Sequence, residues 1–232
     1  MPYPQTLEAK PKIIFFTDFD GTITLKDNSF QGMMDSVTTP FPECIRLLCE
    51  NIKLDPHFSH FYKWSREAGV PVIVLSSGMT PIIRALLVHL VGPEAHDIEI
   101  VSNECIDRPP KKTSEEGGWQ IKFHDDSDFG HDKSLTIRPY AKHFDEHSEE
   151  HRPVMLYAGD GVSDLSAARE TDLLFAKKGY DLVTYCVREG IPFTEFEDWK
   201  SILATTQAIY EGQTTVKDVA AESADKVRQG KN

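Results

Sequence analysis

The sequence predicts an α/β fold in which a parallel β-sheet is flanked by helices. Three observations lead to this fold class: short continuous apolar runs, helical patterns that alternate with those runs, and polar motifs placed directly after them. Continuous apolar runs are typical of strands that are buried on both faces, as parallel strands are. Their alternation with helices favours a single sheet with right-handed crossovers.

The predicted strands are short and rich in β-branched and aromatic residues. The first covers residues 12–18 (Lys-Ile-Ile-Phe-Phe-Thr-Asp) and ends in a carboxylate close to a glycine. The other predicted strands of the parallel sheet cover residues 70–76, 98–101, 153–158 and 173–176. The alternating run 119–123 instead indicates one strand of a surface hairpin.

Helical patterns fill the stretches between these strands. The pattern over 81–91 begins with a proline, a residue tolerated in the first turn, and is followed by Gly92-Pro93 as a stop. Further helices are predicted over 164–170, 181–189 and 198–211. Residues 26–64 have a mixed pattern, expected to be helical and interrupted at Pro40-Phe41-Pro42.

Domain organisation follows from these patterns. The length of 232 residues suits one sizeable domain with a small appendage. We expect a core domain formed by residues 12–25 and 66–212, with residues 26–65 inserted after the first strand. Residues 1–11 are expected to form an N-terminal arm. Residues 213–232 are expected to form a polar C-terminal tail that frays at its end.

Composition and charge exclude some classes of partner. Hydrophobic residues make up 40% of the chain and charged residues 27%, as in ordinary globular proteins. The net charge of −12 argues against binding to nucleic acid, because a phosphate backbone would be repelled. No apolar run is long enough to cross a bilayer and no secretory signal is evident. We therefore expect a cytoplasmic protein with neither nucleic-acid nor membrane partners.

The strongest polar motifs follow predicted strands. Asp18 and Asp20 come after the first strand, Ser76-Ser77-Gly78 ends the second, and Gly-Asp-Gly-Val-Ser-Asp, with Asp160 and Asp164, follows the strand at 153–158. The carboxyl ends of parallel strands meet at one edge of a sheet, where ligands bind. Carboxylates gathered there would repel one another unless a cation lay between them, and oxygen-only ligands favour Mg²⁺. Taken singly, each motif also suits a turn or a helix cap.

The order of these motifs resembles that of the haloacid dehalogenase-like (HAD) hydrolases. The four motifs are Asp-Phe-Asp-Gly-Thr, the strand ending in Ser76, Lys133 in Gly-His-Asp-Lys-Ser, and Gly-Asp-Gly-x-x-Asp. The resemblance covers about residues 12–211 and implies a Rossmann-like core. It is greatest to the phosphoserine phosphatase-like branch (subfamily IB). Within that branch, the sequence around the motifs is most similar to that of a fungal group related to the methylthiopentenyl-phosphate phosphatases.

The resemblance implies a Mg²⁺-dependent phosphoric monoester hydrolase. In such an enzyme Asp18 would attack phosphorus, form an aspartyl-phosphate and bind Mg²⁺. Asp20 would act as general acid and base and bind the metal through its backbone carbonyl. Asp160 would be a second carboxylate ligand of Mg²⁺, and Asp164 would bind it directly or through water.

The remaining site residues are expected to bind the phosphoryl group. The resemblance gives this role to the hydroxyl of Ser76 and the ammonium of Lys133. Backbone N–H groups of Gly21, Ser77 and Gly161 are expected to donate to the same oxygens, because glycine leaves room for a phosphate.

The segment between the first two motifs is shorter than the helical cap found there in the branch. The shortening falls near residues 28–31. Two explanations remain open: a naturally open site for larger substrates, or a spliced or truncated form of a longer protein. Asp27 and Arg46 are candidate substrate-specificity residues. Ser163 stands where phosphoserine phosphatases have asparagine, which argues against phosphoserine as the substrate.

The sequence therefore predicts hydrolysis of a phosphomonoester of a small metabolite. Two alternatives remain: phosphotransfer, in which an alcohol replaces water, and a non-catalytic regulatory or binding protein that keeps the site but has an impaired cap. The sequence predicts neither the particular metabolite nor the oligomeric state.

Overall fold

A seven-stranded sheet runs through the middle of the molecule, with strand order β4-β3-β2-β1-β5-β6-β7. The computed structural model describes residues 11–25, 37–127, 130–147 and 152–228. The strands are β1 (Ile13–Thr17), β2 (Val72–Met79), β3 (Glu99–Asp107), β4 (Trp119–Lys122), β5 (Val154–Gly159), β6 (Leu173–Lys177) and β7 (Phe193–Phe196). All neighbouring pairs are parallel except β3 and β4, which form the predicted antiparallel hairpin. The α/β fold class is confirmed.

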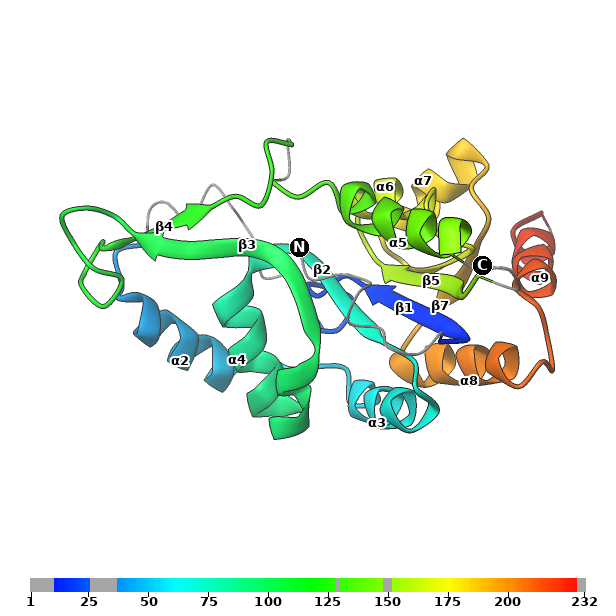
Figure 1. Ribbon diagram of the computed structural model, residues 1–232, viewed down its shortest axis with the longest axis horizontal. Coiled ribbons are helices and arrows are strands. Elements are labelled where there is room, and N and C mark those ends of the chain that lie inside the picture. The colour runs from blue at the N-terminus through cyan, green and yellow to red at the C-terminus, as the bar shows by residue number, and fades with distance from the viewer. Residues whose placement is uncertain (1–10, 26–36, 128–129, 148–151, 229–232) are drawn as a thin grey trace.

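Helices cover both faces of this sheet (Figure 1). On one face lie α5 (Lys133–His147), α6 (Leu165–Ala168) and α7 (Asp181–Glu189). On the other lie α2 (Phe41–Asn51), α3 (Phe58–Ala68), α4 (Thr80–Leu90) and α8 (Trp199–Tyr210). The described residues also include the short 3₁₀ turns η1 (Pro93–Asp97) and η2 (Val162–Asp164). No helix in the described parts of the chain is both long and apolar enough to cross a bilayer.

Strand β1 lies at the centre and divides the core into two clusters. Its register pairs Phe15 with Val72 on one side and with Leu156 on the other. Successive side chains of a strand point to opposite faces. Phe15 accordingly packs against Phe61, with ring centroids 4.7 Å apart, while Phe16 packs edge-on against Tyr140 at 4.9 Å.

The cluster on the α3 and α8 face holds the loop that follows β1. Trp199 packs against Phe58 and Phe61, with ring centroids 4.7 and 4.8 Å away. Its indole Nε1–H donates to the carbonyl of Thr22 at 2.9 Å. Buried Asp55 accepts from the backbone N–H of Trp199 at 3.2 Å, which ties the start of α8 to the segment before α3. The aromatic core thereby fixes the backbone of the loop that carries the first motif.

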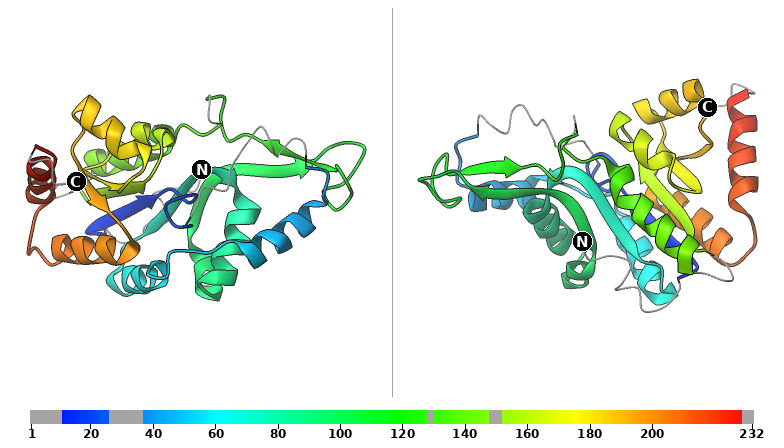
Figure 2. Two further views of the ribbon diagram at one scale, coloured as in Figure 1. Left: turned by 180° about the vertical axis from the view of Figure 1, so that it is seen from behind. Right: turned by 45° about the horizontal axis from the view of Figure 1, so that its top comes forward.

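Two segments differ from what the sequence predicted. Pro40-Phe41-Pro42 was expected to interrupt a helix, but α2 begins there, since proline is well tolerated in the first helical turn. The stretch 213–232 was expected to be a frayed polar tail, yet it contains α9 (Val216–Arg228). Val216, Val219 and Ala220 of α9 pack against the core, and α9 stands beside the outer strand β7 (Figure 2).

Candidate active site

Three buried carboxylates gather at the carboxyl edge of the central strands. Asp18 follows β1, Asp160 follows β5, and Asp164 ends the 3₁₀ turn after Asp160. Each offers a carboxylate oxygen, and these oxygens lie within 4.8 Å of one another. Asp18 and Asp160 are each 7% exposed and Asp164 is fully buried. The structure therefore brings together the carboxylates that the sequence placed at separate strand ends.

Lys133 provides the positive charge in this cluster. Its Nζ lies 3.0 Å from Asp18 Oδ1 and 2.5 Å from Asp164 Oδ1, and the side chain is 1% exposed. Burial acts to lower the pKa of Lys133, but the two carboxylates outweigh it and the net shift is upward. The ammonium is thus charged and held between Asp18 and Asp164. A solvent-facing role, the ordinary one for an isolated lysine, does not apply.

Burial and the neighbouring carboxylates together change the pKa of Asp18. Burial raises the pKa of Asp18 well above its usual range, Lys133 opposes that rise, and Asp164 and Asp160 add to it. Asp18 Oδ1 also accepts from the N–H of Phe19 at 2.8 Å. A divalent cation beside these carboxylates would lower the pKa of Asp18 again, because the ion would be the largest local charge.

Asp164 is surrounded by protein donors. Its Oδ1 accepts from Lys133 and from the hydroxyl of Tyr157 at 2.6 Å. Its Oδ2 accepts from the backbone N–H groups of Asp160 and Gly161, both at 3.0 Å. With both oxygens engaged, Asp164 orients Lys133 and shapes the Asp160 loop.

The donor set of the cluster fits Mg²⁺. It consists of carboxylate oxygens alone, the ligands that Mg²⁺ prefers. Asp160 Oδ1 accepts from the Thr22 hydroxyl at 3.1 Å, which orients the carboxylate beside the loop after β1. Asp18 and Asp160 are the residues best placed to hold the ion, and the bonds already made by Asp164 favour an interaction through water.

Both backbone hydrogen-bonding groups of Gly21 are engaged within the protein. We expected its N–H to bind phosphate, but that N–H donates to Thr24 Oγ1 at 2.9 Å. Its carbonyl accepts from the buried Nζ of Lys177 at 2.7 Å. With φ at +74°, a β-carbon here would lie 2.1 Å from Asp160 Oδ2. Glycine is therefore required for close approach of the carboxylate to the backbone.

The N–H of Gly161 is likewise engaged, because it donates to Asp164 Oδ2 at 3.0 Å. The prediction that Gly161 donates to phosphate does not match this geometry. The bond instead turns the loop so that Asp160 faces Asp18.

Ser76 and Asp20 approach each other over a glycine. A β-carbon at Gly78 would lie 3.2 Å from both Asp20 Oδ2 and Ser76 Oγ. Ser76 is 1% exposed, and its hydroxyl accepts from the N–H of Gly78 at 2.9 Å. The hydroxyl oxygen of Ser77 is buried and makes no hydrogen bond within the described part of the chain. Ser76, near the end of β2, therefore lies close to Asp20.

Of the two candidate specificity residues, the structure describes one, and that one lies away from the cluster. Asp27 lies outside the described residues. Arg46 is on an exposed surface of α2, where its guanidinium forms ion pairs with Glu43 and Glu50 of the same helix. Those contacts account for its conformation without a role in the site.

Sequence reasoning missed two residues that the structure places against the motifs. Tyr157 lies inside β5 and donates to Asp164, while Lys177 ends β6 and holds Gly21. A signal was present in both cases. Each is a polar side chain within or at the end of an otherwise apolar strand, and such groups when buried need a partner.

Comparison with known proteins identifies the family. The sequence profile of the haloacid dehalogenase-like hydrolases matches residues 27–169. The chain is 45% identical to polyol phosphate phosphatase PYP1 of Saccharomyces cerevisiae, over 90% of this chain and 98% of that protein. It is 44% identical to Pdp3-interacting factor 1 of Schizosaccharomyces pombe, over 88% of this chain and 99% of that protein. These relatives agree with the fungal group that the motifs resemble.

A solved structure shows the same fold. An apo phosphoserine phosphatase superposes with a TM-score of 0.59 at 15% identity, covering 83% of this chain and 98% of that one. At this identity the likeness concerns the fold alone. Taken with the profile match and the two fungal relatives, it agrees with the motif order, and the chain belongs to the haloacid dehalogenase-like hydrolases.

Proposed function

We propose that the chain is a Mg²⁺-dependent phosphatase that hydrolyses a phosphomonoester of a small metabolite through an aspartyl-phosphate on Asp18. The observation that carries the proposal is the charged, buried Lys133 held between Asp18 and Asp164 at the carboxyl edge of the sheet. A buried ammonium beside a carboxylate nucleophile offers a fixed positive charge where negative charge develops on a transferring phosphoryl group.

The proposed reaction has two steps. Asp18 attacks phosphorus, and Asp20 gives a proton to the oxygen that leaves, so that the alcohol departs neutral. Asp20 then takes a proton from water as the water attacks the aspartyl-phosphate, which releases inorganic phosphate and restores Asp18. Ser76 and Lys133 donate to the phosphoryl oxygens in both steps. Bound Mg²⁺, held by Asp18 and Asp160 with the Asp20 carbonyl, would supply charge neutralisation for the incoming phosphate.

Polyol phosphates are the first substrate class to test. The name of the budding-yeast relative refers to them, and that protein shares 45% of its residues with this chain over nearly its whole length. Its alignment runs over 242 positions, more than the 232 residues of this chain, so the relative has internal residues without a counterpart here. We propose that the reduced cap lies within residues 26–65, ahead of the core helix α3, and that some of the missing positions belong there.

Residues around the start of α2, which belong to this segment, contact the β3–β4 hairpin at the edge of the sheet. The indole of Trp119 in β4 donates to the carbonyl of Thr39 at 2.9 Å, and its ring lies 5.3 Å from that of Phe41. The start of α2 is thereby fixed to the β3–β4 hairpin. A leaving group extending from the phosphate site would meet a cap held on this hairpin.

The test is turnover of polyol phosphates and of para-nitrophenyl phosphate, with Mg²⁺ and with EDTA. We expect activity with Mg²⁺, loss with EDTA, and a fall of at least about a thousandfold in Asp18→Asn. Exposed Asp97 in η1 provides the matched control, Asp97→Asn, which should turn over like wild type. Measuring phosphate release and substrate loss separately, with an alcohol present, distinguishes hydrolysis from transfer.

An Asp18→Asn protein that kept a tenth of the wild-type rate would remove Asp18 as nucleophile. A folded wild-type protein with no turnover of any phosphomonoester in the panel would favour the non-catalytic alternative.

A further inference from the structure

Two buried side chains, His131 and Asn103, hold the end of β2 that carries Ser76 and Ser77. His131 is 1% exposed, and its Nδ1 lies 3.1 Å from the carbonyl of Ser76. Asn103 is fully buried, and its Nδ2 donates to the carbonyl of Ser77 at 2.7 Å. Two consecutive peptide carbonyls near the end of β2 are therefore bound by side chains from elsewhere in the chain.

The hydrogen bonds of His131 fix its tautomer. A carbonyl can only accept, so Nδ1 carries the proton that it donates to Ser76. Nε2 lies 3.1 Å from Thr136 Oγ1. Burial lowers the pKa of His131 to about 4, so the ring is neutral near pH 7 and Nε2 accepts from the Thr136 hydroxyl. Each ring nitrogen thus has one partner and one role.

Both side chains join the end of β2 to the segment that leads to Lys133. His131 lies two residues before Lys133, and its bond to Ser76 therefore links the two groups proposed to bind phosphate. Asn103 Oδ1 accepts from the N–H of His124 at 2.8 Å, at the start of the same segment. The rings of His124 and His131 also meet edge-on, with centroids 4.6 Å apart.

The planarity of the peptide bond makes this arrangement a positioning device. In a trans peptide the C=O and the following N–H point in opposite directions, so holding the carbonyls of Ser76 and Ser77 also orients the N–H groups of Ser77 and Gly78. The N–H of Gly78 in turn donates to Ser76 Oγ at 2.9 Å, which directs the hydroxyl. A displacement of about 1 Å in a catalytic group can cost roughly a hundredfold in rate.

We propose that His131 and Asn103 are positioning residues that set the geometry between Ser76 and Lys133 for phosphoryl binding. The inference rests on the proposed phosphatase function. Asn103 lies outside the motifs that carry the family resemblance, and His131 lies within the Lys133 motif but has no role assigned to it there. Neither residue contacts the carboxylate cluster in the bonds that the described residues show.

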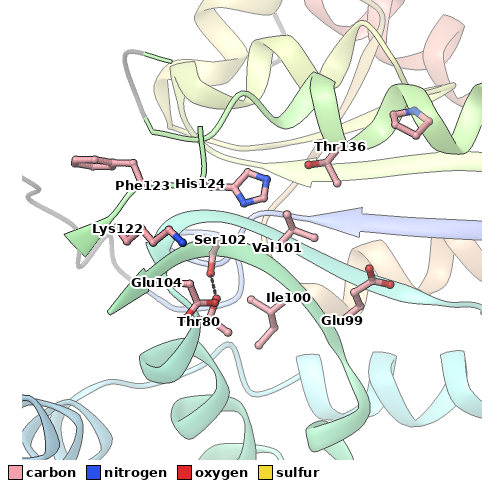
Figure 3. Close-up of a pocket in the computed structure, with 11 residues that line it drawn as sticks. Thr80, Glu99, Ile100, Val101, Ser102, Glu104, Lys122, Phe123, His124 and Thr136 are labelled. Atoms are coloured by element: carbon pink, nitrogen blue, oxygen red, sulfur yellow. Dashed lines mark hydrogen bonds between the residues drawn. The ribbon is translucent and has the colours of Figure 1, made fainter. Parts of the chain in front are cut away.

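A cavity lies beside two of the residues that contact His131. About 390 Å³ in volume, it lies between β3 and α5, with His124 and Thr136 on its wall (Figure 3). Figure 3 shows the His124 ring projecting between Ser102 and Thr136. His124 and Thr136, the two cavity-wall residues that contact His131, therefore have open space beside them.

The test uses two substitutions that each keep one of the two bonds of His131. His131→Asn keeps a donor at the position of Nδ1, facing Ser76, whereas His131→Gln places its amide at the position of Nε2, facing Thr136. We expect His131→Asn to retain kcat within about threefold and His131→Gln to lose roughly tenfold to a hundredfold. Both variants give up one buried bond, so their unfolding midpoints in urea should fall by similar amounts.

The difference in kcat between the two variants distinguishes a positioning role of His131 from a purely structural one. A purely structural role would lower turnover in both variants alike, or in neither, and either result would overturn the inference. His89→Gln at an exposed position of α4 is the matched control and should behave as wild type.

Asn103→Asp provides a second, independent variant. It keeps the acceptor for His124 N–H but replaces the donor to Ser77 by an oxygen, and should lose tenfold or more in kcat. Exposed Asn51→Asp is its control. If His131→Gln fails to fold, the Asn103→Asp rate decides: a wild-type value contradicts the inference and a tenfold loss supports it.

Equilibrium binding of orthovanadate with Mg²⁺ tests the inference without turnover. Orthovanadate adopts the five-coordinate shape of a phosphoryl-transfer transition state, so we expect it to bind at least about tenfold more weakly to His131→Gln than to His131→Asn. Equal affinities would contradict the positioning role. A wild-type protein that binds orthovanadate yet hydrolyses nothing would contradict the proposed function, while the binding comparison would still decide the role of His131.

Discussion

The neutral, buried state of His131 predicts a specific loss of stability in mild acid. In the folded protein the pKa of His131 is lowered to about 4, chiefly by burial and also by nearby Lys133 and His124, while the bond to Ser76 and the charge of Asp125 oppose the shift. In the unfolded chain the ring returns to its ordinary pKa of about 6.5. Between these values the unfolded state binds more protons, so stability falls as pH falls.

The magnitude follows from the two pKa values. At pH 7 the His131 ring is mostly neutral in both the folded and the unfolded state. Its titration therefore contributes little to the free energy of unfolding at that pH. At pH 5 the unfolded ring is almost fully protonated and the folded ring is not, which lowers the free energy of unfolding by about 2 kcal/mol relative to pH 7. The loss approaches a limit of about 3 kcal/mol as the pH falls below the folded value.

The assay is urea unfolding of wild type and of His131→Asn at pH 7 and pH 5. Other titrating groups, such as the Asp18 cluster, are present in both proteins and cancel in the comparison. The wild type should lose about 2 kcal/mol more than His131→Asn between the two pH values. His89→Asn should lose as much as wild type. Equal losses in wild type and His131→Asn would refute the reasoning, because they would mean that His131 titrates normally in the fold.

Three further predictions concern the carboxylate cluster. Gly21→Ala should cost about 2 kcal/mol or more in urea unfolding, because φ is +74° and the methyl group would lie 2.1 Å from Asp160 Oδ2; a loss near zero would show that the loop relaxes freely. Tyr157→Phe removes one donor to Asp164 but leaves Lys133, so we expect the free energy of unfolding in urea to fall by about 1–2 kcal/mol. An unchanged free energy of unfolding would count against the Tyr157–Asp164 hydrogen bond. We expect Mg²⁺ to raise the Tm of the wild type in calorimetry, and Asp160→Asn to remove most of that rise. Tyr157→Phe should keep the rise. An unchanged rise in Asp160→Asn would exclude Asp160 as a Mg²⁺ ligand.

The central strands and the site edge could be predicted because their signals are local. The run 12–18 is apolar throughout, and β1 occupies residues 13–17 with every side chain buried. Asp18 and Asp160 each follow such a run, so parallel topology alone brings them to one edge. Helix α7 has the predicted bounds, since its capping glycine at 190 is a local signal.

Elements whose burial depends on distant partners could not be predicted in this way. Strand β7 has only four residues, and the first and last of them are buried by contacts with β6 and its neighbours. Helix α9 is polar over most of its surface and is stabilised by the few apolar residues that pack on the core. A propensity-based interpretation has no access to these contacts.

The hydrogen bonds and ion pairs of the site residues likewise could not be predicted from the sequence. That Lys133 is buried depends on the meeting of Asp18 and Asp164, which come from segments about 145 residues apart. The engagement of the Gly21 N–H by Thr24 depends on the exact turn after β1. Motif order therefore indicates which residues gather, but not which of their hydrogen-bonding groups remain available.

The bond between Lys177 and the carbonyl of Gly21 also bears on the timing of folding during synthesis. It joins residues 156 positions apart, and at about 5–20 residues per second a ribosome needs roughly 8–30 seconds to add them. Strand β1 emerges early but waits for β5, its later partner on that side of the sheet. Until β5 emerges, that edge of β1 has no strand to pair with. The bond from Lys177 forms later still, so a nascent chain exposes the apolar strand β1 well before the loop bearing Asp18 acquires its final shape.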